Sequence, residues 1–283
     1  MLAGIADLDT PEAPEMIALA EKLSVMYDDF LDGFDEDKAV RDPGIHASEI
    51  VACIRKSYYC LTEVEKRPSS AKAWTKRFEV GHAVHDMVQR HFRKMAAREN
   101  AKKYASNLAK MNGWHLSFEP EVKVAPHLQE IADYYRLFSS CDGVFTFRQN
   151  IDSPPFLRVG LEIKTESPDG WDKLKSPKPI HVEQMHLYMA ALDLPIAWFF
   201  YFNKGNQNNT PSTGPWLVKF DHSVWTKIEL RINAAIQSAI DGVEPPREEG
   251  MHCEFCPWSY ACGPKYLDRN KPKSFVSVRR SGP

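Results

Sequence analysis

The chain has 283 residues, of which 43% are hydrophobic and 26% are charged. That length is enough for one large domain or two small ones, and the composition is that of a globular protein rather than a disordered chain. The longest tight apolar cluster, residues 196–202, is too short to cross a bilayer, and the acidic N-terminus lacks the basic-then-apolar pattern of a secretory signal. We therefore expect a cytoplasmic protein rather than a membrane or secreted one.

The net charge of −2 conceals an asymmetry along the chain. Residues 1–40 hold eleven acidic residues against two lysines, which gives −9 and leaves +7 for the remaining 243 residues. We expect an acidic helical N-terminal segment (1–40), a core (41–263) and a basic C-terminal tail (264–283). A basic body fits a polyanionic partner such as DNA, although surface charge often serves only solvation. The acidic segment either binds a protein partner, shields a basic groove or is simply solvated.

Helical signals dominate the first part of the chain. The pattern predicts an amphipathic helix over residues 11–31, and Ser48 is a candidate N-cap for a helix running through residues 50–57. A long helix is predicted from about Thr75 to a break near residue 112, and its basic second half is typical of a solvated arm. The inward candidates of this helix are Val84, His85, Val88, Phe92 and Met95.

From residue 117 the hydrophobic period changes to that of strands. Strands are predicted at 117–124, 141–147, 157–165 and 197–202, with 216–220 as the partner of the fourth, and helices at 181–192 and 222–242. Helices, then a small sheet with an embedded helix, then a final helix predict an α/β fold: a small central mixed sheet flanked by helices, with helical N-terminal additions.

Two acids and a lysine are the first candidates for a chemical site. Glu162 and Lys164 are two residues apart and share one face of their strand, and Asp142 begins the preceding strand. If the strands pair, Asp142 and Glu162 converge on one cation, and Mg²⁺ needs few carboxylates when phosphate and water supply its other ligands. Metal-assisted attack of water on a phosphodiester is the chemistry implied. The competing interpretation is a turn at residue 142 and a solvated strand face.

Four short motifs in order resemble the PD-(D/E)XK nuclease superfamily, and most closely its RecB-like branch with a restriction-endonuclease-like core. They are Gly81-x3-His85, Asp142-Gly143, Glu162-Ile163-Lys164 and Gln184-x3-Tyr188, and the resemblance spans about residues 46–263.

The resemblance implies His85, Asp142, Glu162 and the Ile163 backbone carbonyl as ligands of Mg²⁺ or Mn²⁺. It also implies Lys164 as the catalytic lysine, supported by Gln184 and Tyr188. His82 is the alternative to His85, and Cys141 stands where an aliphatic residue commonly precedes the aspartate.

Three cysteines near the end of the core, Cys253, Cys256 and Cys262, are spaced as a metal site that lacks one ligand. Cys53 is the best fourth candidate, with Cys60 two helical turns further on. Four thiolates hold zinc or a 4Fe–4S cluster equally well, and unligated thiols are the remaining alternative. The chain is similar here to iron–sulfur nucleases of the CRISPR-associated adaptation and AddB types, which favours a 4Fe–4S cluster on Cys53, Cys253, Cys256 and Cys262, with zinc second.

Together these features predict a metal-dependent deoxyribonuclease. The resemblance implies an exonuclease on single-stranded or frayed DNA ends, in recombination, repair, phage or CRISPR-type DNA processing. One alternative is a DNA-binding or assembly module with a structural four-cysteine site and little catalysis. Another is an endonuclease, although the sequence offers no separate domain for reading bases.

Overall fold

The computed structural model describes residues 44–66, 72–105, 115–124, 137–205, 216–250, 252–253 and 256–262. The predicted acidic segment, its helix and the basic tail therefore lie outside the described residues. The chain divides into two compact units: residues 1–41 with 70–83, and residues 42–69 with 84–283. Of the first unit the structure describes the opening turns of one helix, and the second unit holds the sheet and both candidate sites.

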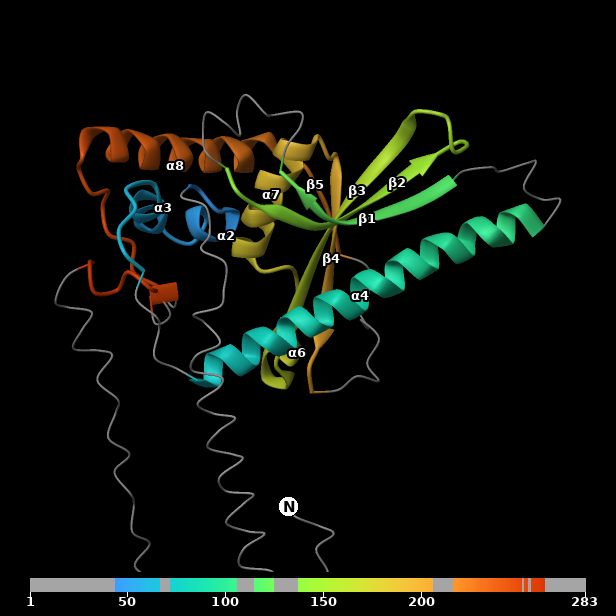
Figure 1. Ribbon diagram of the computed structural model, residues 1–283, viewed down its shortest axis with the longest axis horizontal. Helices are drawn as coiled ribbons and strands as arrows, with labels where there is room; N and C mark the ends of the chain where they lie inside the picture. The colour runs from blue at the N-terminus through green and yellow to red at the C-terminus, as the bar shows by residue number, and fades with distance from the viewer. Residues whose placement is uncertain are drawn as a thin grey trace, which may run out of the picture. The chain divides into compact units, whose positions relative to one another are not determined.

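A mixed five-stranded sheet in the order β1-β2-β3-β4-β5 forms the centre of the second unit (Figure 1). The strands are β1 (His115–Lys123), β2 (Ser140–Arg148), β3 (Pro155–Glu166), β4 (Ile196–Asn203) and β5 (Trp216–Lys219). All neighbours pair antiparallel except β3 and β4, which are parallel and joined by α6 (Pro168–Lys173) and α7 (Pro179–Leu192). The predicted α/β fold with a mixed sheet is confirmed.

Each face of the sheet is covered by its own helices. On one face α7, α8 (His222–Asp241) and α2 (Ala47–Ile50) surround a core that includes Met185 and Phe199. On the other, α4 (Lys72–Ala105) packs residues from Val84 onward against an aromatic layer around Phe92. The odd residues of β3, such as Leu161, point to α4, so Glu162 and Lys164 belong to the α7 face.

Several local details differ from the sequence predictions. Ser48 lies inside α2, whose N-cap is His46, and the next helix, α3 (Ile54–Leu61), begins after Cys53. Met95 is 38% exposed, because the buried stripe of α4 follows four-residue steps from Val84 to Ala96. The pattern also missed α6, which begins where the Ser167 side chain accepts a hydrogen bond from Gly170 N. No helix among the described residues has the length and apolar character needed to cross a membrane.

The lack of a side chain at Gly143 is a packing requirement. A Cβ atom there would overlap the ring of Phe118 and lie 3.3 Å from the carbonyl oxygen of Glu119. Phe118 cannot easily move, because its ring centroid is 4.6 Å from that of Phe145 and 5.7 Å from that of Phe92.

We therefore predict that Gly143→Ala lowers the free energy of unfolding by about 1–3 kcal/mol, as overpacking of a core does. Gly81→Ala is the matched control, since among the described residues no atom outside its own helical backbone lies within 4 Å of the added methyl, and alanine is the better helix former. Urea denaturation of both variants measures the difference. Equal stability of Gly143→Ala and the wild type would show that the Phe118 ring gives way.

Candidate functional site

Asp142 lies where the sheet pairing is interrupted. The β2–β3 register begins at Gly143 opposite Leu161, and β1 pairs on either side of Glu121 but not at Glu121 itself, whose φ is 49°. The Asp142 side chain takes up the next backbone group of β3: its Oδ2 accepts a hydrogen bond of 2.6 Å from Ile163 N. The N–H and C=O of one strand residue point the same way, so the Ile163 carbonyl also faces the β2 side.

His85 reaches the same aspartate from α4. Its Nδ1 lies 3.3 Å from Asp142 Oδ1, and its side chain is 25% exposed. Burial acts to lower the pKa of His85, but the hydrogen bond to Asp142 and its charge outweigh burial and raise that pKa. His82, the alternative, has a side chain that is 71% exposed and lies 3.9 Å from Glu79. Of the two histidines, the structure therefore brings His85 to Asp142.

One turn after His85, Gln89 also contacts Asp142 from α4. It is 6% exposed, and its Nε2 donates to Asp142 O at 2.9 Å and to Glu121 Oε1 at 2.6 Å. The Gln89 amide thus gives the Asp142 carbonyl a hydrogen bond at the position where β1 and β2 are not paired. Sequence reasoning missed Gln89, although its spacing of four from His85 places it on the same helical face.

Glu162 is buried, with 1% exposure, and is not the solvated strand residue of the competing interpretation. Lys164 Nζ lies 2.6 Å from its Oε1, yet neither carboxylate oxygen has a well-aligned hydrogen-bond donor among the described residues. Burial raises the pKa of Glu162 to about 7, with Asp142 adding to the rise and Lys164 opposing it. A buried carboxylate oxygen without a donor is a suitable ligand for a divalent cation.

Residues of α7 continue the polar chain from Lys164. Lys164 Nζ donates to Gln184 Oε1 at 3.4 Å, and Gln184 Nε2 donates to Tyr188 OH at 3.0 Å. Burial raises the pKa of Tyr188 well above its usual range, so its hydroxyl stays protonated. The structure thus brings all the predicted active-site side chains together, from β2, β3, α4 and α7.

A further histidine, His181, lies one turn before Gln184 on the same face of α7, and sequence reasoning missed it. Its Nδ1 lies 2.8 Å from Tyr201 OH, which also accepts a hydrogen bond from Lys178 N at 3.0 Å. Burial and the charges of Lys164 and Lys178 lower the pKa of His181 to about 3, so the ring is neutral. The spacing from Gln184 was the available signal.

The four predicted cluster cysteines, from both ends of the core, line one pocket. Cys53 precedes α3, and the others lie in the segment that follows α8. Two donors are aimed at one sulfur, since Arg55 Nη1 lies 3.8 Å and Tyr59 OH 3.7 Å from Cys262 Sγ. Burial raises the pKa of Cys53, and that of Cys256 to about 11, so these thiols stay protonated unless a metal takes them. The four thiols line a common pocket, but no three of their sulfur atoms lie within 4.8 Å of one another, so they are not arranged around a single ion.

No family model matches the chain, and no curated protein matches it. Among solved structures it is similar to the crystal structure of SSO0001, at 14% identity and a TM-score of 0.44, over 85% of this chain and 96% of the other. It is also similar to an alkaline exonuclease, LHK-Exo, from Laribacter hongkongensis, at 12% identity and a TM-score of 0.37, over 72% of this chain and 91% of the other. The same exonuclease in complex with dAMP gives 13% identity and a TM-score of 0.33.

Proposed function

We propose that this protein is a metal-dependent deoxyribonuclease of the PD-(D/E)XK type. The observation that carries the proposal is a group of contacts at one end of β3. Glu162 is buried and paired with Lys164, and Asp142 lies between His85 and the backbone N–H of Ile163. A solvated strand would expose these groups. Burying Glu162 beside the partly buried Asp142 and Lys164 is costly, and that cost is offset when a cation and a phosphate complete the site.

In this proposal the residues divide the work by their chemistry. Asp142, Glu162, the Ile163 carbonyl and His85 would hold Mg²⁺ or Mn²⁺, which would supply Lewis-acid activation of water and phosphate. The Lys164 ammonium, anchored by Glu162, orients the attacking water and stabilises negative charge as the water oxygen bonds to phosphorus and the leaving oxygen departs.

The α7 residues position Lys164 and the DNA. Gln184 accepts a hydrogen bond from Lys164 and donates one to Tyr188. These bonds fix the orientation of the Lys164 ammonium group. The proposed substrate is a DNA end, single-stranded or frayed, cleaved exonucleolytically. This part rests on the resemblance of the four motifs to RecB-like nucleases.

We also propose that Cys53, Cys253, Cys256 and Cys262 hold a 4Fe–4S cluster, with zinc as the second choice. Their common pocket and the donors to Cys262 support a ligated group rather than free thiols. The cluster would link the residue before α3 to the segment after α8, and so cross-link the two ends of the core.

His181 extends the proposed site toward the DNA. Tyr201 OH accepts from Lys178 N, and His181 Nδ1 is its other partner among the described residues, so the hydroxyl donates its proton in a hydrogen bond to Nδ1. The ring proton is then on Nε2, which makes His181 an uncharged donor beside Lys164. We propose that it binds a phosphate oxygen of the substrate.

The first prediction under this proposal concerns cleavage. With Mg²⁺ or Mn²⁺, the wild type should shorten end-labelled linear DNA and leave circular DNA intact, and EDTA should stop it. Asp142→Asn, Glu162→Gln and Lys164→Met should each lower the rate by about 100-fold or more while the protein still unfolds cooperatively.

Lys227→Met, which changes an exposed lysine of α8, is the matched control and should cleave normally. Wild-type rates in any of the three site variants would place the active site elsewhere. Cleavage of circular DNA would make the protein an endonuclease, and DNA binding without any cleavage would favour the assembly module.

A second prediction tests the cysteine pocket. Protein purified without oxygen should be brown and contain about four irons per chain. Cys256→Ser should lose both, whereas Cys141→Ser, which removes a fully buried thiol outside the pocket, should keep both. A colourless protein with stoichiometric zinc would overturn the iron assignment and keep the four ligands.

A third prediction tests His181 through DNA binding. In the cleavage-deficient Glu162→Gln background, His181→Ala should weaken the Kd for single-stranded DNA by about 2- to 10-fold, the value of one neutral hydrogen bond. His181→Gln, which keeps a donor near Nε2, should restore it. Because the donor is uncharged, the slope of log Kd against log salt should not change.

His186→Gln is the control for this series. His186 is also on α7, but both of its ring nitrogens are already used, by Val182 O at 2.8 Å and Asp221 N at 3.1 Å. Its substitution should lower stability without changing the Kd for DNA. A His181→Ala variant that binds DNA as tightly as the Glu162→Gln protein would remove His181 from the DNA path.

A further inference from the structure

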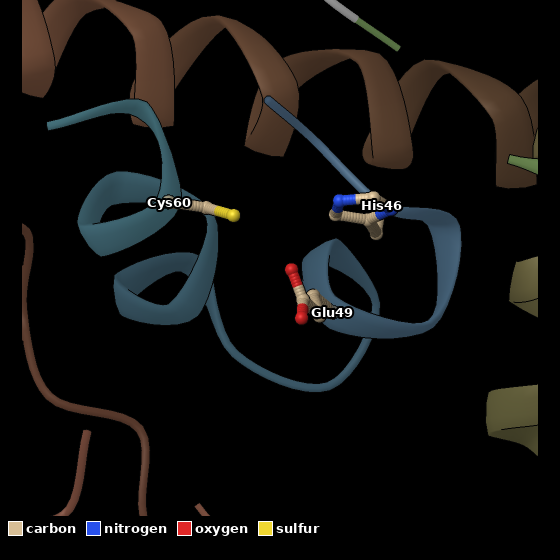
Figure 2. Close-up of side chains that lie close together, drawn as sticks. All are labelled: His46, Glu49 and Cys60. Atoms are coloured by element: carbon tan, nitrogen blue, oxygen red, sulfur yellow. The ribbon is translucent and has the colours of Figure 1, made fainter. Parts of the chain in front are cut away.

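Three potential metal donors outside both sites lie together between α2 and α3. The imidazole of His46, the carboxylate of Glu49 and the thiol of Cys60 each offer one donor atom, and these atoms all lie within 4.8 Å of one another. Figure 2 shows the three side chains turned toward one another from the two short helices. His46 is 9% and Cys60 5% exposed, so the group is largely enclosed.

The backbone holds these donors in place. His46 is the N-cap of α2 and Glu49 lies one turn later, with Glu49 N donating to His46 O at 2.9 Å. The turn that follows is closed by Cys53 N, which donates to Glu49 O at 2.8 Å, and α3 then carries Cys60 in its last turn. The structure therefore separates the two early cysteines: Cys53 lines the four-cysteine pocket, and Cys60 belongs to a different group.

The donor set differs in kind from both other sites. Mg²⁺ prefers an all-oxygen shell, whereas one nitrogen, one oxygen and one sulfur suit a borderline ion such as Zn²⁺. With bond lengths of about 2.0–2.3 Å, tetrahedral ligand atoms are about 3.3–3.8 Å apart, so donors within 4.8 Å need only small side-chain rotations to close on an ion. Three protein ligands leave the fourth position to water.

We propose that His46, Glu49 and Cys60 bind one Zn²⁺-type transition-metal ion, with water as the fourth ligand. The ion would join α2 to α3 on either side of Cys53. This site does not depend on nuclease activity, so its test stands apart from that of the proposed function.

Co²⁺ is the probe, because a thiolate in a tetrahedral site gives Co²⁺ strong visible and charge-transfer absorption. Titration of the anaerobic full-length protein with Co²⁺ should detect one more thiolate-ligated Co²⁺ site per chain in the wild type than in Cys60→Ser, and Zn²⁺ should abolish that difference. The four-cysteine pocket contributes equally to both proteins, so the difference isolates this site. Cys141→Ser, the matched loss of a buried thiol, should titrate like the wild type.

Glu49→Gln is the second variant, because it keeps the size of a partly exposed side chain and removes a charged ligand. Its Co²⁺ affinity should fall by more than the about 10- to 100-fold that loss of an outer-shell partner costs, while the iron content and colour stay unchanged. Identical Co²⁺ titrations of the wild type, Cys60→Ser and Glu49→Gln would overturn the proposal.

Discussion

The burial of the Glu162 carboxylate is the constraint on which the arrangement of the candidate site depends. Glu162 is 1% exposed, and the loss of its hydration favours the protonated form. Lys164 supplies an opposite charge, but a single ammonium does not satisfy both oxygens. The strand register that brings Asp142 level with Glu162 adds a second negative charge, which worsens the balance further. An arrangement this unfavourable for an empty site is favourable for a site that receives a cation.

A second constraint is the closure of the chain on itself around α3. Glu248 accepts from the backbone N of Ile54 at 2.7 Å and forms a two-contact ion pair with Arg231 of α8 at 2.7 and 2.9 Å. A carboxylate at the N-terminus of α3 is favourable in itself, and the Arg231 pair fixes its direction. Because Ile54 follows Cys53 directly, the same contacts set where Cys53 meets the three late cysteines. Hydrogen bonds and an ion pair therefore hold the backbone next to Cys53 in place at the four-cysteine pocket.

The strands could be predicted well because their burial is visible in the sequence. A strand buried on one face alternates apolar and polar residues, and a strand buried on both faces is continuously apolar. Each predicted strand lies within two residues of the observed one. Glu162 and Lys164 could be placed on one face for the same reason. The burial of Glu162 could not be predicted, because it depends on α7 covering that face. Likewise Ala96 replaces Met95 because the sheet surface, rather than side-chain size, selects which stripe of α4 is buried. Spacing could place His181 on the face of Gln184, but the contacts of His181 with Tyr201 and of Cys60 with His46 and Glu49 lie between elements and could not be predicted.

The three groups of donors differ in the softness of their ligand atoms, and softness determines which metal ion each group would prefer. The Asp142–Glu162 centre offers mainly oxygen, the four cysteines only sulfur, and the group at His46 one donor of each kind. Transition metals bind most protein sites more tightly than Mg²⁺, so an oxygen site in the cell stays with Mg²⁺ only when its preference for softer ions is weak. Lys164 contributes here, because its positive charge offsets one of the two carboxylates and lowers the general affinity for cations. A weakly charged oxygen site leaves several waters on a bound Mg²⁺, which hydrolysis requires, while the sulfur-containing groups are the stronger competitors for softer ions. The same lysine proposed to orient water would thus also help to keep the proposed Asp142–Glu162 centre selective for hard cations.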